Sequence, residues 1–208
     1  MFTGLIQAQG TLLTVEEPSP HNRSWWVQVP ASLLATLNVG DSLALNGCCT
    51  TVVQTCPQRQ GVQVHLGPET LACTTFGTTL AGASLNLEPP LSLGAPLGGH
   101  LVSGHVDGLA TLEALHPEGD CWRLQFALSE ALAPQAPLLV PKGSITLNGI
   151  SLTLNEVEGP RFGVCIIPHT WQVTNLHQLA VGHAVHVELD LLGKYVQRLM
   201  QPYLPAFA

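Results

Sequence analysis

Two histidines lie in one glycine-rich stretch near the middle of the chain, GGHLVSGHVDG at 98–108. Histidine can bind a metal ion, act as a general acid or base, or make a backbone hydrogen bond at a strand end. His100 and His105 are five residues apart, and the neighbouring glycines disfavour a helix. On a strand, an odd separation puts two side chains on opposite faces. The spacing therefore argues against a shared metal ion, and we expect no metal site here.

The motif around these histidines belongs to an internal repeat with an offset near one hundred residues. Thr3-Gly4-Leu5 returns as Ser103-Gly104-His105, and SLALNG at 42–47 returns as SITLNG at 144–149. Further matching pairs are Thr51 with Thr153, Pro68 with Pro168, Thr74 with Thr174, and Glu88 with Glu188. The period is too long for a solenoid unit, so the repeat predicts duplication of a whole small domain.

Each half of the chain has the pattern of short β-strands separated by turns. Asn-Gly pairs at 46–47 and 148–149 interrupt runs rich in Val, Leu, Ile and Thr, which is typical of a type I′ hairpin. Further strands are expected at 62–67, 83–88, 162–168 and 183–190. Several short strands in each hundred residues predict an all-β fold built from small antiparallel barrels.

Three other segments have helical or linker patterns. Short helices are expected at 30–37 and 129–133, and Pro and Gly concentrate in a linker at 87–97. Near the C-terminus, apolar residues recur at helical spacing up to Pro202, which should end that helix near Gln201. The apolar residues are Leu192, Val196, Leu199, Met200 and Tyr203. Their stripe suits packing on the barrels or assembly with another subunit, and the pattern alone leaves both open.

Composition limits the class of protein. The 208 residues suit one large domain or two of about 100 residues. Hydrophobic residues make up 46% and charged residues 10%, with a net charge of −7 and no basic stripe, which argues against nucleic-acid binding. The chain shows no signal-peptide pattern and no membrane-length apolar run. Six cysteines without CxxC pairing suggest reduced, mostly buried thiols in a cytoplasmic protein.

Several segments, in order along the chain, together resemble the α-chain type of the riboflavin synthase family. They are MFTGLIQAQG at 1–10, LNGCCTTV at 45–52, PETL at 68–71, GGHLVSGHVDG at 98–108, VPKGSITLNGISLTL at 140–154, IPHTWQVTNL at 167–176 and LDLLGKYVQRL at 189–199. The resemblance implies two tandem six-stranded Greek-key barrels plus a C-terminal α-helix. The expected domains are 1–97 and 98–190, followed by an assembly helix at 191–208.

The resemblance also implies an activity. The family's reaction is the dismutation of two molecules of 6,7-dimethyl-8-ribityllumazine, the last step of riboflavin biosynthesis. This transferase moves a four-carbon unit between them and yields riboflavin and 5-amino-6-(D-ribitylamino)uracil, with no metal or redox cofactor. The implied assembly is a homotrimer, and an association with lumazine synthase is left open. Two homologous barrels suit one substrate that must be bound twice in unequal roles.

By the same resemblance, each barrel holds one substrate ring. In the first barrel the binding residues would be Gly4, Leu5, Ile6, Cys49, Thr50, Thr51, His65, Leu66, Gly67, Pro68, Glu69 and Thr70. In the second they would be Gly104, His105, Val106, Lys142, Ser151, Leu152, Thr153, Cys165, Ile166, Ile167, Pro168, His169 and Thr170. The side chains expected nearest the chemistry are Cys49, His105, Lys142, Ser151 and Thr153.

Other interpretations stay open from the residues alone. Cys49 also suits core packing, His105 a strand-end backbone hydrogen bond, and Lys142 a solvated turn. His100 is expected in a structural or interface role. A non-catalytic lumazine or flavin binder of the antenna type is the main alternative function. A flavin oxidoreductase is a weaker one, because no GxGxxG fingerprint follows a strand.

Overall fold

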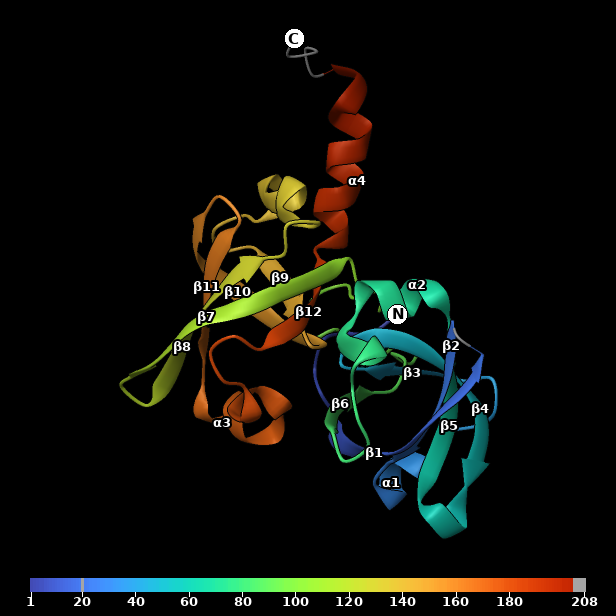
Figure 1. The fold of residues 1–208 in the computed structure, drawn as a ribbon. Helices are drawn as coiled ribbons and strands as arrows, with labels where there is room; N and C mark the ends of the chain where they lie inside the picture. The colour runs from blue at the N-terminus through green and yellow to red at the C-terminus, as the bar shows by residue number, and fades with distance from the viewer. Residues whose placement is uncertain (20, 204–208) are drawn as a thin grey trace.

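The computed structural model describes residues 1–19 and 21–203, and it contains two β-barrels lying side by side (Figure 1). The first barrel is closed by β1 (Ala8–Ser19), β2 (Asn22–Gln28), β3 (Ser42–Leu45), β4 (Cys48–Cys56), β5 (Gly61–Leu66) and β6 (Ser84–Glu88). The strands pair in the order β1-β2-β5-β4-β3-β6. The hairpin-connected strands β3, β4 and β5 thus have β2 beside β5, which is a Greek-key arrangement.

The second barrel repeats the first. It is closed by β7 (Gly108–Glu118), β8 (Cys121–Leu128), β9 (Ser144–Leu147), β10 (Ile150–Glu158), β11 (Arg161–Ile166) and β12 (Ala184–Leu189). Its strand order matches that of the first barrel when β7 is equated with β1. The predicted all-β class, with two tandem six-stranded barrels, is confirmed.

Each barrel encloses its own apolar core. In the first, the rings of Trp25 and Phe76 pack with centroids 4.6 Å apart, and both side chains are fully buried. In the second, Phe126 and Phe162 stack at 5.6 Å. Inward-facing Val and Leu side chains fill the remaining interior of both barrels. The alternation of the strands therefore accounts for two closed cores rather than one shared core.

The two Asn-Gly turns form the expected hairpins and meet at the barrel interface. Asn46 and Asn148 both have φ 45°, and the following glycines have φ 80° and 83°, as a type I′ turn requires. A Cβ on Gly47 would lie 2.6 Å from the amide nitrogen of Gly149. Glycine is therefore needed at this position both for its backbone angle and for close contact between the barrels.

A buried polar network joins the barrels beside these turns. Asn86 Nδ2 donates to the carbonyl of Asn148 over 2.9 Å, and its Oδ1 accepts from the amide of Asn175 over 2.8 Å. His186 occupies the corresponding place in the second half. Its Nδ1 lies 3.0 Å from the carbonyl of Asn46, and its Nε2 accepts from the amide of Thr75 over 3.0 Å. The neutral imidazole, with its proton on Nδ1, therefore donates one hydrogen bond and accepts another, as the side-chain amide of Asn86 does.

The short helices agree only partly with the sequence. The helix expected in 30–37 is present as α1 (Ala31–Leu34), whereas the prediction of a helix at 129–133 is wrong. A 3₁₀-helix covers Ala133–Leu138 instead, where Pro134 and Pro137 lack the N–H groups that an α-helix needs. The linker prediction at 87–97 began too early, because Leu87 and Glu88 belong to β6.

Two further helices were not expected, and they follow equivalent strands. They are α2 (Pro68–Cys73) after β5 and α3 (Pro168–Val173) after β11. Each begins with proline, which is favoured at the first helical position because its missing N–H has no intrahelical partner there. The PET and PHT motifs of the repeat are thus helix starts.

The C-terminal helix α4 (Leu191–Met200) projects away from the second barrel (Figure 1). Its α-helical part ends before Gln201, as Pro202 predicts, and a 3₁₀ turn follows at Gln201–Tyr203. Among the described residues, no helix is both long and apolar enough to cross a membrane. The end of the predicted assembly helix, 204–208, lies outside the described residues.

Candidate functional site

The segment before each barrel packs on the other barrel. The amide of Cys49 in β4 donates to the carbonyl of Gly104 over 2.7 Å, and the amide of Ser151 in β10 donates to the carbonyl of Gly4 over 2.8 Å. Val106 accordingly packs on the core of the first barrel, and Ile6 on that of the second. Residues 104–106 thus complete a site on the first barrel, and residues 4–6 complete one on the second.

This exchange corrects the predicted grouping of the site residues. The sequence grouped Gly4, Leu5 and Ile6 with Cys49, and Gly104, His105 and Val106 with Ser151. The structure pairs each segment with the opposite barrel. The physical reason is that Phe2 and Val102 pair with each other in an antiparallel bridge between the barrels, so each following glycine turns onto the partner barrel. The boundaries predicted at 97 and 190 stay predictions.

Two glutamates hold the exchanged segments in place. The carboxylate of Glu88 accepts from the amide and hydroxyl of Thr3, each at 2.7 Å, and from the amide of Gly4 at 3.0 Å. Glu188 makes the same three bonds with Ser103 and Gly104, at 2.7, 2.7 and 2.9 Å. Burial raises the pKa of Glu88, although these hydrogen bonds oppose that shift. The repeat had paired the two glutamates without indicating what they do.

The first pocket is an open hollow between β4, α2 and the exchanged segment. Its lining residues are Cys48, Cys49, Glu69, Thr70, Cys73, Thr74, Gly104, His105 and Val106. Gly104 has φ 82°, and a Cβ there would lie 2.7 Å from the Cβ of Cys49. The contact leaves no room for a side chain at 104 and directs His105 over the pocket. Predicted residues from both halves therefore meet in one cavity.

The second site surrounds Ser151 and includes His100, which has no equivalent residue at the first pocket. The Oγ of Ser151 lies 2.7 Å from Nδ1 of His100, and Nε2 of the same ring lies 3.1 Å from Oγ1 of Thr146. Burial lowers the pKa of His100, so its ring is neutral at pH 7. With Nε2–H donating to Thr146, Nδ1 is free to accept the proton of the Ser151 hydroxyl.

The two histidines of the glycine-rich stretch thus serve different sites. His100 contacts the second site, whereas His105 lines the first pocket. The sequence predicted a structural or interface role for His100 and did not predict its hydrogen bond with Ser151. Sequence spacing gave no sign of this contact, because His100 precedes the repeat unit and has no counterpart in the first half.

The remaining predicted residues fall into three groups. Buried in the barrel walls are Thr50, whose hydroxyl donates to the carbonyl of Leu43 over 2.8 Å, and the core residues Leu66 and Ile166. Exposed on the surface are Leu5, Thr51, His65, Pro68, Lys142, Thr153, Ile167, Pro168 and His169. Half-buried are Gly67, Leu152, Cys165 and Thr170. Thr153 shares a strand face with Ser151, but Lys142 makes no side-chain hydrogen bond or ion pair with another described residue.

The sequence analysis missed Cys48, Cys73 and Thr74, which line the first pocket. All six cysteines are free thiols, as expected, but the prediction that most are buried is wrong. Only Cys48 is buried, and the other five are half-buried. Burial, helped by the neighbouring Cys49, raises the pKa of the Cys48 thiol to about 12. Cys48 is therefore a protonated thiol in the wall of the pocket.

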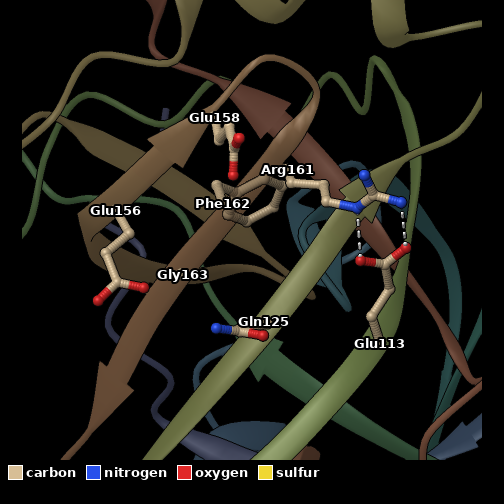
Figure 2. A pocket seen from close by; sticks show the side chains of 7 residues that line it. All are labelled: Glu113, Gln125, Glu156, Glu158, Arg161, Phe162 and Gly163. Carbon is tan, nitrogen blue, oxygen red and sulfur yellow. Dashed lines mark hydrogen bonds and ion pairs between the residues drawn. The ribbon is translucent and has the colours of Figure 1, made fainter.

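Another hollow lies on the second barrel, and its lining shares no residue with either candidate site (Figure 2). Its lining residues are Glu113, Gln125, Glu156, Glu158, Arg161, Phe162 and Gly163. Arg161 pairs with Glu113 across 2.9 Å, and both side chains are exposed. None of the predicted site residues lines it, and exposed ion pairs of this kind add little to stability. We therefore place the candidate sites at the exchanged segments.

Comparison with known proteins identifies the family of the chain. A family model described as the lumazine binding domain matches residues 3–89 and again 103–190. The chain is thus a protein with two lumazine binding domains. A riboflavin synthase of Brucella abortus is 36% identical over 206 residues, covering 97% of this chain and 98% of its own. One from Mycobacterium bovis is 37% identical over 204 residues, with the same coverage. The chain belongs to the riboflavin synthase family, which confirms the resemblance seen in the sequence.

Solved structures show the same fold. LumP in complex with riboflavin superposes with a TM-score of 0.81, at 24% identity, covering 91% of this chain and 99% of that one. LumP in complex with 6,7-dimethyl-8-(1′-D-ribityl) lumazine gives a TM-score of 0.79 at 23% identity, with the same coverage. At this identity the likeness concerns the fold alone.

Proposed function

We propose that the chain is a riboflavin synthase. It converts two molecules of 6,7-dimethyl-8-ribityllumazine into riboflavin and 5-amino-6-(D-ribitylamino)uracil. The observation that carries this proposal is the pair of equivalent sites, each completed by a segment from the other half, in a chain similar over nearly its full length to curated riboflavin synthases. A dismutation needs one kind of substrate in two different environments, and the two sites differ in their reactive side chains.

The first pocket supplies a thiol and an imidazole, in Cys49 and His105. The backbone of Val106 and the Thr70 hydroxyl offer hydrogen-bonding groups to a pyrimidinedione edge. The 7-methyl group of the lumazine is acidic because its anion delocalises into the ring. Donors that bind the ring oxygens stabilise that anion, so a weak base such as His105 is sufficient to remove the proton.

The second site supplies a hydroxyl with a base beside it. His100 Nδ1 accepts the proton of the Ser151 hydroxyl while the oxygen adds to the electrophilic C7 of a bound lumazine. Thr146 holds the ring of His100 through Nε2, which fixes the tautomer required. Thr153 lies on the same strand face as Ser151 and is assigned to binding the ribityl chain. Lys142 is the remaining charged group proposed at this site.

We propose a homotrimer assembled through α4, with each reaction centre formed between the first barrel of one subunit and the second barrel of a neighbour. The apolar face of α4 is exposed in the single chain: Leu192, Tyr195, Val196 and Leu199 are 61–68% exposed, and Tyr203 is 80% exposed. Exposed apolar stripes of this kind mark assembly surfaces. Three further parts of the proposal are taken from the family. Riboflavin is the product, the protein is cytoplasmic, and it can associate with lumazine synthase.

Assembly can be tested by measuring molar mass in solution with light scattering. Wild-type protein should give three times the chain mass, and replacing Leu192, Val196 and Leu199 together by serine should give the single-chain mass and lower turnover. Arg198→Ala, on α4 but outside the apolar stripe, is the matched control and should stay trimeric. A wild-type monomer with full turnover would contradict the trimer.

The activity can be tested by mixing purified protein with 6,7-dimethyl-8-ribityllumazine, without added cofactor, and following products by chromatography. One riboflavin for every two substrates consumed is expected. The alternative, an antenna-type lumazine binder, would bind the substrate and release no riboflavin. Substrate binding without turnover would therefore overturn the enzyme assignment and favour that alternative.

A further inference from the structure

The helix α4 is anchored to its own barrel near its N-terminal end. Gly193 packs there against Leu138, because a Cβ on this glycine would lie only 3.3 Å from Cδ2 of the leucine. Lys194 forms a second anchor, with its Nζ 2.6 Å from Oδ2 of Asp107. No residue of α4 is buried, and the helix projects away from the second barrel (Figure 1). Since a helix takes its direction from the side chains that it packs on, these two anchors set the direction of α4.

A hollow lies between the first two turns of α4 and the 3₁₀-helix at Ala133–Leu138. Asp107 and Lys194 line it, together with Leu132, Gln135 and Gln197. Side chains do not fill the space beside the ion pair, so packing alone does not fix the tilt of the helix there. The side chains of Lys194 and Asp107 are 27% and 25% exposed, and a partly buried pair is screened less by salt than an exposed one. The ion pair is therefore able to restrain the helix.

Asp107 connects this anchor to the wall of the first pocket. It directly follows the exchanged segment 104–106, in which His105 lines the pocket. Oδ2 of Asp107 accepts from the amide of Leu189 in β12 over 2.8 Å, and the same oxygen pairs with Lys194. The residue next to the exchanged segment is thus bonded to the barrel and to the helix at once. A shift of the helix therefore acts directly on the end of the segment that carries His105.

The first half of the chain lacks this anchor at the equivalent position. Gln7 corresponds to Asp107, because their amides donate to the carbonyls of Leu87 and Val187, respectively, over 3.0 and 2.8 Å. The side chain of Gln7 is uncharged and donates instead to the carbonyl of Leu5 over 3.2 Å. The carboxylate is therefore present only in the half of the chain that continues into α4.

We propose that Lys194 and Asp107 form a positioning pair, which holds the wall of the first pocket in register with α4. The inference rests on the proposed function, because it needs α4 to bring a neighbouring subunit to the first pocket. The helix determines where the second barrel of the neighbour lies, and Asp107 determines where His105 lies. One ion pair thus places the two parts of a reaction centre relative to each other. Neither Lys194 nor Asp107 lines the pocket, so both act through His105.

The charge of Lys194 can be removed while most of the side-chain length is kept. Lys194→Met, compared with wild type at the same molar mass by light scattering, should bind riboflavin about fivefold more weakly at one of its two sites. Lys194→Arg keeps the charge and should restore most of this affinity. Hydrogen–deuterium exchange in Lys194→Met should be faster at the Cys49 amide, which is bonded to Gly104, and unchanged at the Ser151 amide.

Arg198→Met is the matched control on the same helix. The Arg198 guanidinium donates to the side chain of Gln201, within the C-terminal end of the helix, over 2.7 Å. Removing this charge should change neither riboflavin binding nor exchange at the Cys49 amide. An equal effect of Arg198→Met and Lys194→Met would overturn the proposal, because the loss would then follow from the charge of the helix rather than from the ion pair.

Asp107→Asn tests the same pair from the barrel side, because its remaining oxygen still accepts from Leu189. Combined with Lys194→Met, it should weaken binding no further than either change alone, since the pair is already broken. Additive losses, or equally faster exchange at the Cys49 and Ser151 amides, would overturn the proposal. So would a Lys194→Met protein that changes only in molar mass or stability. Failure of the proposed function would appear separately, as wild-type protein that binds riboflavin and forms none from the lumazine.

Discussion

The backbone amide of Cys49, in the first barrel, donates a 2.7 Å hydrogen bond to the carbonyl of Gly104, which precedes the second barrel. Ser151 and Gly4 form the reciprocal bond at 2.8 Å. Neither candidate site can therefore be built from one half of the chain. A substitution in one half of the chain should therefore affect the site on the barrel of the other half, and this can be measured.

Glu188 belongs to the second barrel, yet it should support the first pocket. Its carboxylate holds Ser103 and Gly104, so Glu188→Gln should loosen the Cys49–Gly104 bond and cost about 2 kcal/mol of folding stability. Hydrogen–deuterium exchange should be faster at the Cys49 amide and unchanged at the Ser151 amide. Glu88→Gln is the matched control and should show the opposite pattern. If each variant acted only on its own barrel, the exchange would be refuted.

Glycine at 104 should be needed for space as well as for backbone angle. A Cβ there would lie 2.7 Å from the Cβ of Cys49 and 2.8 Å from Cε2 of Phe2. Gly104→Ala should therefore cost about 3 kcal/mol in urea unfolding and weaken riboflavin binding. Gly82 has φ 93° with no atom within 4 Å of the added Cβ, so Gly82→Ala should cost only about 1 kcal/mol. Equal losses would show that backbone strain alone is involved.

His100 should act as the base for Ser151. His100→Gln should lower kcat about 100-fold while leaving the unfolding free energy nearly unchanged. Because burial lowers the pKa of His100, the neutral ring persists through pH 7, and the part of kcat that depends on this ring should be lost only below the usual histidine range near pH 6.5.

The contribution of the His100 ring to this acid limb should be absent in His100→Gln and present in His105→Gln, although both variants turn over more slowly. A wild-type limb retained in His100→Gln would assign the titration to another group. The comparison separates a role for the His100 ring from a general loss of activity at low pH.

His186 should make folding stability depend on pH. Its burial at the barrel interface lowers its pKa to about 4, below the unfolded value of about 6.5. Between these values the unfolded chain binds more protons, so stability is lost as pH falls, by about 3 kcal/mol in all.

Urea unfolding at a series of pH values measures this loss. His186→Asn installs the residue that the first half uses, Asn86, and should remove most of the dependence while keeping both bonds across the interface. A variant with the same slope between pH 6.5 and 4 as wild type would show that other groups cause it.

The sequence predicted the architecture because local patterns determine it. Asn46-Gly47 and Asn148-Gly149 require positive φ, the strands alternate with period two, and Pro202 stops a helix. The exchange of 4–6 and 104–106 could not be predicted in this way. A repeat shows which residues are equivalent, but it does not show on which barrel a connecting segment packs.

The same limit explains the missed site residues. His100 has no counterpart in the repeat, and its contacts with Ser151 and Thr146 join residues 51 and 46 positions away. The sequence gives no sign that Cys73 lines a pocket, because this depends on the packing of α2 beside β4. Proline kept 129–133 from becoming an α-helix because the following segment lacks two backbone donors.

The most direct test of the central claim follows the four-carbon unit itself. Substrate labelled with ¹³C at C6, C7 and both methyl groups is supplied to the purified protein, and the products are examined by mass spectrometry. The account predicts riboflavin carrying the label of two substrate molecules, together with a pyrimidine product carrying none. Riboflavin with the label of only one molecule, or bound substrate without products, would contradict it.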